Sequence, residues 1–252
     1  MIVAIGQQRI VEDADVNKMK ALSLVKRAIQ HEAKIVVLPE ASNTGLFPEN
    51  FAKAKSLEEE LDMILKLSER KDILIIAGVI EKSEGKLFNS VALIYRGEVV
   101  GKYSKILLFP LNEERKYLSA GRELKVFETD FGKIGILICY EIRFPELARK
   151  LMKMGAEIIA VPAEFPAERI EHWRTLLKAR AIENQLYVLG ANCVSPDGFY
   201  GGNSMIVDPM GNVVNEAGNL QEIIIGEINL EEVRKVREEY PFLKDLKVVS
   251  KF

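Results

Sequence analysis

The feature that most constrains this chain is a repeated alternation between short apolar runs and longer segments with helical spacing of apolar residues. An apolar run at residues 2–5 predicts a strand, and apolar side chains at three- and four-residue intervals across 15–32 predict an amphipathic helix. The run AKIVVLPE, residues 33–40, then predicts a buried strand. The order returns in the second half, where the predicted strand KIGILIC precedes the predicted helix PELARKLMKMGA and the predicted strand EIIAVP. This alternation favours an α/β fold.

Between and after these units the sequence predicts further elements. A capping-box pattern at Ser56 begins a helix, residues 73–80 form an apolar run typical of a buried strand, and a turn at 96–97 separates two hairpin strands. Residues 105–121 show no periodicity, so we expect a long loop, and such loops are more often functional than idle. AERIEHWRTLLKARAIENQ predicts another helix, and QLYVLGANC, NSMIVDP and EIIIGEINL predict strands.

An internal similarity shapes the prediction of the architecture. AKIVVLPEAS and AEIIAVPAEF both describe a strand that follows a helix and ends at a proline close to a glutamate. We interpret them as two similar βαβ halves packed face to face, which with the hairpin gives two mixed sheets covered by helices on the outside. No Gly/Ser/Pro-rich linker divides the chain. We therefore expect a single domain over residues 1–252, with a C-terminal arm over about 231–252 that comprises a short helix and an extended segment.

Charge and cysteine content restrict the classes of function. The 35 basic and 37 acidic residues give a formal net charge of −2 and form no basic stripe, so we expect no nucleic-acid partner. The opening MIVAIGQQ lacks the features of a signal peptide, and no apolar run reaches the roughly 18 residues of a membrane span. The two cysteines, Cys139 and Cys193, form neither a disulfide framework nor a CxxC pair. We expect a cytoplasmic protein with reduced thiols and no membrane contact.

Cys139 is the candidate nucleophile. It ends the apolar run GILIC and precedes YEIRFPEL, where a helix is expected to begin near Pro145. A strand–turn–helix junction exposes a side chain at the edge of a sheet and leaves backbone N–H groups free to bind an oxyanion. The alternative is a buried structural cysteine, and position alone does not exclude it.

A thiol nucleophile needs a group that takes its proton. The chain has two histidines, and we expect His31 to face solvent and His172 to be a hydrogen-bonded structural residue on a helix. A Cys–His pair stays open from the sequence. If neither histidine is the base, a carboxylate or a lysine in a dry pocket must be. Glu40, directly after Pro39 at the end of a buried strand, is the leading candidate, with an ordinary surface glutamate as the alternative.

Two further charged residues lie near expected strand ends. Lys105 in GKYSKILLF lies between a strand and an apolar run, and Glu114 lies in the 105–121 segment. Taken singly, each is more typical of a solvated surface residue, the lysine with its stem along apolar surface.

The four residues occur jointly in a pattern that resembles the nitrilase superfamily of carbon–nitrogen hydrolases. The matching segments are VVLPE around Glu40, GKYSKILLF around Lys105, E-x-x-Y-x-x-x-G from Glu114, GKIGILICYEIRFPELAR around Cys139, GAEIIAVPAEF, HWRTLLKARAIENQLYV, GGNSMIVDPMGNVV and EINLEEV. The resemblance spans essentially the whole chain. It implies a four-layer α-β-β-α sandwich, usually dimerised through helices that flank the sheets and through the C-terminal arm.

The resemblance also implies roles for the candidate residues. Glu40 takes the proton of Cys139 and later activates water, while Lys105 and the backbone N–H of Tyr140 stabilise the tetrahedral oxyanion. Glu114 orients the lysine and the substrate nitrogen. The resemblance implies an acyl-enzyme thioester that releases ammonia or an amine, with no metal and no organic cofactor.

Within the superfamily, EFPAERIEHWRTLLKARAIENQ looks most like omega-amidases, which hydrolyse the terminal amide of 2-oxo acids such as 2-oxoglutaramate. A carboxylate-bearing substrate calls for a cation in the pocket. Arg169 and Arg143 are candidates, although for Arg143 we favour a bracing role against a carboxylate in its own turn. Phe165 and Phe47 are candidates for the pocket wall, with the core as the alternative for both.

Rival functions remain open from the sequence. They are another amidase of the superfamily, acting on deaminated glutathione or N-carbamoyl amino acids, a true nitrilase, and a non-catalytic binding protein on the same fold. Intact Glu40, Lys105, Glu114 and Cys139 argue against the last. Cys193, in a predicted buried strand, is interpreted as a small apolar filler.

Overall fold

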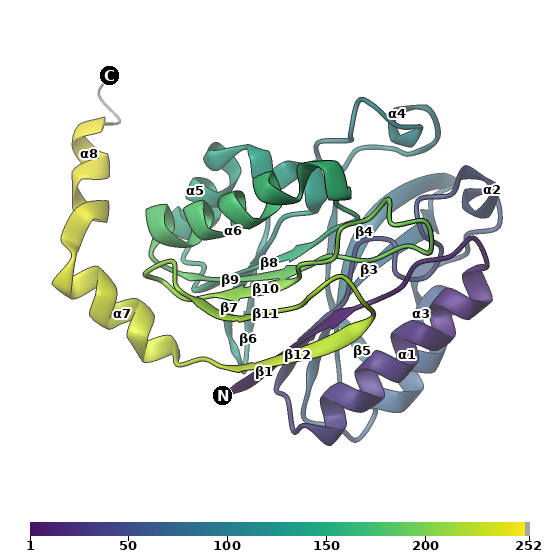
Figure 1. Ribbon diagram of the computed structural model, residues 1–252, viewed down its shortest axis with the longest axis horizontal. Helices are drawn as coiled ribbons and strands as arrows, with labels where there is room; N and C mark the ends of the chain where they lie inside the picture. The colour runs from purple at the N-terminus through teal and green to yellow at the C-terminus, as the bar shows by residue number, and fades with distance from the viewer. Residues whose placement is uncertain (250–252) are drawn as a thin grey trace.

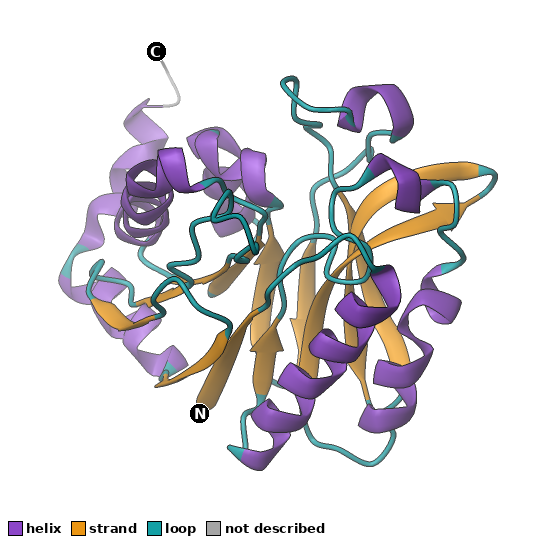
Figure 2. Cartoon of the chain, turned by 45° about the vertical axis from the view of Figure 1, so that its right-hand side comes forward, coloured by secondary structure: helices purple, strands orange, loops and turns teal. Residues whose placement is uncertain are grey.

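Two six-stranded β-sheets pack face to face in the computed structural model, which describes residues 1–249 (Figure 1). Helices cover the outer face of each sheet, as the 45° view in Figure 2 shows. The predicted four-layer α-β-β-α sandwich with two mixed sheets is confirmed.

The first sheet has the strand order β12-β1-β2-β3-β4-β5. The central strands β1, β2 and β3 are parallel, while β12 and the predicted hairpin pair antiparallel at either side. Its strands are β1 (Ile2–Gln7), β2 (Ile35–Val37), β3 (Leu74–Ser83), β4 (Lys86–Tyr95), β5 (Glu98–Ser104) and β12 (Glu222–Glu227).

The second sheet repeats this plan with the order β11-β10-β9-β8-β7-β6. Its three central strands β7, β8 and β9 are again parallel and its flanking pairs antiparallel. The strands are β6 (Val126–Thr129), β7 (Gly132–Ile136), β8 (Ile158–Pro162), β9 (Tyr187–Ala191), β10 (Met205–Val207) and β11 (Val213–Glu216). The sequence similarity around β2 and β8 thus marks equivalent central strands of the two sheets.

The outer layers come from the predicted amphipathic helices. Helix α1 starts at Asp13, whose side chain accepts two backbone N–H groups, and α3 starts with the predicted Ser56–Glu59 capping box. The helices are α1 (Ala14–Gln30), α2 (Pro48–Phe51), α3 (Leu57–Ser68), α4 (Glu114–Tyr117), α5 (Pro145–Lys153), α6 (Ile170–Asn184), α7 (Leu230–Glu239) and α8 (Leu246–Val249), with 3₁₀ turns η1 (Cys139–Arg143), η2 (Ala167–Arg169) and η3 (Pro241–Asp245).

Alternation along the strands divides the core into layers. In β1, Val3 and Ile5 belong to the cluster between the two sheets, whereas Ala4 packs with the residues under α1 and α3. Strands β1 and β2 face β9, and β3 faces β8. The central strands are therefore apolar on both faces, as their continuous apolar runs predict.

Two segments differ in detail from the prediction. The 105–121 segment is largely irregular, but a single helical turn, α4, interrupts it. The C-terminal arm is helical beyond α7, through η3 and α8, rather than extended, and α8 projects from the body in Figure 1. Residues 250–252 of the predicted arm lie outside the described residues. Within 1–249, none of the helices combines the length and apolar character needed to cross a bilayer.

Candidate active site

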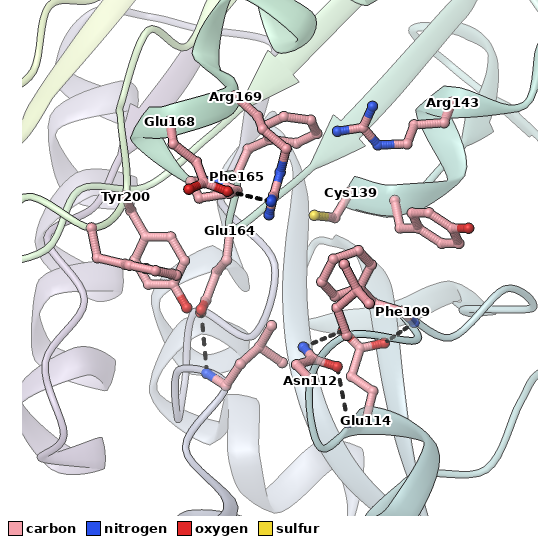
Figure 3. Close-up of a pocket in the computed structure, with 15 residues that line it drawn as sticks. Phe109, Asn112, Glu114, Cys139, Arg143, Glu164, Phe165, Glu168, Arg169 and Tyr200 are labelled. Atoms are coloured by element: carbon pink, nitrogen blue, oxygen red, sulfur yellow. Dashed lines mark hydrogen bonds and ion pairs between the residues drawn. The ribbon is translucent and has the colours of Figure 1, made fainter.

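Cys139 lies at a strained turn that directs its side chain into a pocket (Figure 3). β7 ends at Ile136, and the chain turns into η1 at Cys139 itself, whose φ of 47° is in the left-handed region. A non-glycine residue rarely adopts this conformation, and such strain concentrates at functional positions. The sequence prediction of a strand–turn–helix junction at this cysteine is confirmed in its geometry.

A buried carboxylate holds this turn in place. Glu141 accepts hydrogen bonds from the backbone N–H of Ile138 at 2.8 Å, of Ile106 at 2.8 Å and of Leu107 at 3.1 Å. The hydroxyl of Tyr103 donates to both of its oxygens, at 2.8 and 2.9 Å. Glu141 therefore ties the turn of the cysteine to the segment that follows β5.

That segment carries Lys105, whose side chain is fully buried between two carboxylates. Its Nζ lies 2.7 Å from Oε1 of Glu40 and 2.8 Å from Oε1 of Glu114. Oε2 of Glu114 also accepts the backbone N–H of Phe109 at 3.0 Å. The three residues predicted from separate segments are thus brought into one buried cluster, next to Cys139.

Glu40 follows β2 and is held by groups from both sheets. Asn89 of β4 donates to its Oε1 at 2.7 Å, and the backbone N–H of Glu164, after β8, donates to its Oε2 at 3.0 Å. The close approach of this turn to β3 requires a glycine, because a Cβ at Gly78 would lie 2.2 Å from the carbonyl oxygen of Pro39. The base candidate is therefore rigidly positioned.

Burial decides the protonation states in this cluster. Burial raises the pKa of the Cys139 thiol well above its usual value, and the adjacent Glu40 carboxylate, which accepts a hydrogen bond from the thiol, adds to the increase. Burial alone lowers the pKa of Lys105, but Glu40 and Glu114 outweigh it and raise the pKa, so the ammonium persists. Burial also raises the pKa of Glu114. The resting nucleophile is a neutral thiol with a carboxylate acceptor beside it.

A pocket of about 290 Å³ opens above this cluster. Its walls come from the 109–114 loop, the turn of Cys139, the loop at 164–169 and the loop at 199–200 (Figure 3). A volume at the lower end of the range for ligand sites suits a small molecule. Cys139 and Glu114 line this pocket, whereas Glu40 and Lys105 are buried in the cluster next to it. A thiol with a proton acceptor and a cation beside it suits nucleophilic attack on a carbonyl carbon.

Both candidate arginines line the pocket, on the same side of Cys139 in Figure 3. The guanidinium of Arg169 pairs with the carboxylate of Glu168. The guanidinium of Arg143 stacks over the ring of Phe165 at 5.1 Å, and among the described residues no carboxylate lies within ion-pair distance of it. The favoured bracing role for Arg143 is therefore not supported, because its turn is braced by Glu141 instead.

The remaining candidates divide between pocket and body. Phe165 and Tyr140 line the pocket, and the N–H of Tyr140 belongs to the first turn of η1, where N–H groups lack intrahelical acceptors. Phe47 does not line the pocket. Its ring packs against Gly45 instead, so closely that a Cβ at that glycine would lie 2.6 Å from a ring carbon. The wall at that point is Leu46.

Both histidines lie outside the pocket lining, and His31 is exposed, as predicted. His172, expected to be a hydrogen-bonded structural residue, is also exposed, with its Nδ1 3.4 Å from Nη1 of Arg143. Cys193 is fully buried, in agreement with the filler prediction.

Four polar residues of the pocket were not predicted from the sequence: Asn112, Glu164, Glu168 and Tyr200. A signal for Glu164 was present, since it is the glutamate of AVPAEF, in the segment similar to that of Glu40. Tyr200 lies in an irregular loop, where periodicity gives no information.

Known proteins show the same pattern over nearly the whole chain. Residues 2–238 match the family model described as carbon-nitrogen hydrolase. A 2-oxoglutaramate amidase of Bacillus subtilis is 37% identical over 92% of this chain and 91% of its own length. Omega-amidase NIT2 of Xenopus tropicalis is 35% identical over 89% of this chain and 87% of its own. The crystal structure of Nit3 from Saccharomyces cerevisiae, a member of branch 10 of the nitrilase superfamily, superposes with a TM-score of 0.88 at 29% identity, covering 96% of this chain and 94% of that one.

The fold, the pocket and these relatives define the class of the protein as a hydrolase of carbon–nitrogen bonds other than peptide bonds. The chain belongs to the carbon–nitrogen hydrolase family and, within it, is an amidase of the nitrilase superfamily.

Proposed function

We propose that this amidase is an omega-amidase, which releases ammonia from the terminal carboxamide of a small 2-oxo acid such as 2-oxoglutaramate. The observation that carries the proposal is a small pocket lined by Cys139 and by two arginine side chains, Arg143 and Arg169, which lie on the same side of the thiol in Figure 3. Relatives named 2-oxoglutaramate amidase and omega-amidase support the choice of substrate.

In the proposed reaction the Cys139 sulfur attacks the amide carbon while its proton passes to Glu40. Because the thiol is neutral at rest, proton transfer accompanies the attack instead of preceding it. Collapse of the tetrahedral adduct breaks the carbon–nitrogen bond, and the nitrogen leaves as ammonia with the proton from Glu40. Water then attacks the thioester, with Glu40 as the base, and releases the acid and the free thiol.

Developing negative charge on the amide oxygen is assigned to Lys105 and to the backbone N–H of Tyr140. Carboxylates on both sides already hold the Lys105 ammonium in place, so little free energy is needed to reposition it when the oxyanion forms. Glu114 holds the lysine from the second side, and its carboxylate can accept a hydrogen bond from the N–H of the substrate amide.

The substrate carboxylate is assigned to the two arginines. Arg143 has no carboxylate partner among the described residues and offers its guanidinium to an anion directly, while Arg169 must exchange or share Glu168. Phe165 fixes the plane of the Arg143 guanidinium by stacking.

An ammonia-release screen tests the substrate. It compares 2-oxoglutaramate, glutamine, an N-carbamoyl amino acid and a simple nitrile; for deaminated glutathione, whose amide nitrogen leaves as the amine of a dipeptide, the released amine is measured instead of ammonia. We expect the highest kcat/KM with 2-oxoglutaramate and no hydrolysis by the Cys139→Ala variant, whereas Cys193→Ala, which removes the second, fully buried thiol, retains activity. Activity in a folded Cys139→Ala variant contradicts the mechanism, and a strong preference for a compound without a carboxylate contradicts the substrate and the role of the arginines.

We also propose a cytoplasmic homodimer. Both cysteines are free thiols, which suits a reducing compartment. Three large apolar side chains are exposed, as expected of surfaces that pair in an assembly. They are Ile182 on α6, Met210 in the turn before β11, and Phe242 in the C-terminal arm. Light scattering on the purified protein tests the dimer, and a monomer at micromolar concentration contradicts it.

A further inference from the structure

Glu164 is a buried carboxyl that the proposed reaction does not use. It follows Pro162 at the end of β8, its backbone N–H donates to Oε2 of Glu40 at 3.0 Å, and its side chain forms part of the pocket wall. Only 4% of the residue is exposed. Figure 3 places its carboxyl beside the hydroxyl of Tyr200, at the lower left of the view, away from Arg143 and Arg169.

The two oxygens of Glu164 differ in their surroundings. Oε2 accepts the backbone N–H of Leu46 at 3.4 Å, and the Tyr200 hydroxyl also donates to the carboxyl. Oε1 is buried and has no hydrogen-bond partner. No cationic side chain among residues 1–249 lies within ion-pair distance of Glu164. A buried polar atom without a partner is costly unless a ligand supplies the missing hydrogen bond, and Glu164 lines the pocket in which a ligand would bind.

The charges around Glu164 favour its neutral form. The groups that face it are Glu40, Glu114, Tyr200 and Cys193, and none of them is a cation. Burial raises the pKa of Glu164 well above its usual value, and Glu40 raises it further. A neutral carboxyl carries one O–H donor, in contrast to an ionised one, which only accepts.

We propose that Glu164 is a specificity-determining residue whose carboxylic acid donates a hydrogen bond from the unpartnered Oε1 to the 2-oxo oxygen of the substrate. The inference rests on the proposed function and adds a recognition element to it. In a 2-oxo acid amide the oxo group lies between the amide and the carboxylate, and Glu164 lines the same small pocket as Cys139 and the two arginines, so one bound molecule can contact all of them.

This arrangement distinguishes a 2-oxo acid amide from the same amide acid without the oxo group. An oxo oxygen accepts the hydrogen bond, whereas a methylene group at that position leaves the acid O–H without an acceptor. A donor left unpaired in a buried site discriminates strongly between otherwise similar ligands.

The test compares two substrates that differ only in the oxo group, 2-oxoglutaramate and the same amide acid without it. Ammonia release gives kcat/KM for each in wild type, Glu164→Gln and Glu164→Leu. The Gln side chain keeps a neutral donor, so the preference for the oxo compound stays within about threefold of wild type. The Leu side chain removes the donor, so the preference falls by about tenfold, the value of one ordinary hydrogen bond. An equal loss in both variants, or none in either, overturns the inference.

A pH profile keeps the inference testable if the Leu variant does not fold. Ionisation of Glu164 at alkaline pH abolishes the donor, so the preference of the wild type for the oxo compound declines as pH rises. Glu164→Gln shows no such decline, and the same decline in both overturns the inference. If the wild type hydrolyses neither compound, the proposed function fails and this inference fails with it. If it hydrolyses both, and the preference does not depend on residue 164, only the inference fails.

Discussion

Glu141→Gln tests whether the turn of the nucleophile is held by one buried carboxylate. The glutamate accepts three backbone N–H groups, from Ile138, Ile106 and Leu107, as well as the Tyr103 hydroxyl. A glutamine has a single acceptor oxygen. If that oxygen keeps the contacts to Ile106 and Leu107, its NH₂ group faces the N–H of Ile138.

The magnitude follows from that mismatch. One buried backbone N–H left without an acceptor costs about 1–3 kcal/mol, and the remaining hydrogen bonds weaken because the acceptor has lost its charge. Burying a charged glutamate costs desolvation free energy, which also raises the pKa of Glu141. A neutral glutamine avoids this cost, and so offsets part of the stability that is lost with the hydrogen bonds. We expect a net destabilisation of about 2 kcal/mol. Because Ile138 precedes Cys139, a small displacement there lowers kcat/KM by about 10- to 100-fold.

Urea unfolding followed by the fluorescence of Trp173, the single tryptophan of the chain and fully buried, measures the stability, and ammonia release measures the activity. Glu146→Gln makes the same chemical change at an exposed position of α5 and serves as the control. A Glu141→Gln protein with the stability and activity of the control refutes the bracing role.

Two further predictions concern the buried cluster. Lys105→Met keeps the length of the side chain but removes the cation, so we expect kcat to fall by about 10²–10³. The control, Lys66→Met on the exposed face of α3, leaves ammonia release unchanged. Equal rates in the two variants contradict the oxyanion role of Lys105. Glu40→Gln stops hydrolysis yet lowers the pKa of the Cys139 thiol, because it removes a negative charge that raises that pKa and leaves the Lys105 ammonium, which lowers it. Thiolate absorbance against pH, with a Glu40→Gln/Cys139→Ala double variant as the blank, measures the shift, and a pKa at or above that of wild type contradicts it.

The sequence predicts the architecture well because its central strands are apolar on both faces and its helices carry clear caps. The sequence identifies the candidate catalytic residues only because they occur together in a known pattern; taken singly, each is more typical of a structural or solvated residue. They are Cys139, Glu40, Lys105 and Glu114. Their meeting in space depends on parallel strands of two sheets that end at one edge, which spacing alone does not encode.

Other features of the site could not be predicted, for physical reasons. Glu141 lies where a glutamate is common, in the first turn of a helix, so the sequence shows no sign of a special role. It braces the turn of Cys139 by accepting backbone N–H groups some 35 residues away in sequence. Phe47 is a candidate for the pocket wall from the sequence, with the core as the alternative, but in an irregular loop a shift of one residue changes the direction of the side chain, and Leu46 lines the pocket instead. From the sequence, Glu164 is an ordinary carboxylate near the end of a strand; only the structure shows that its Oε1 is buried without a hydrogen-bond partner.

The reacting groups are divided between the two sheets, with Cys139 after β7 of one sheet and Glu40 and Lys105 after β2 and β5 of the other. The distance from thiol to base is therefore set by the thickness of the apolar layer between the sheets, where residues such as Ile5 and Leu189 lie. A core substitution far from the pocket that brings the sheets closer or moves them apart changes the reach of the proton transfer directly. In this molecule the interior between the sheets is a spacer for the chemistry as well as a source of stability.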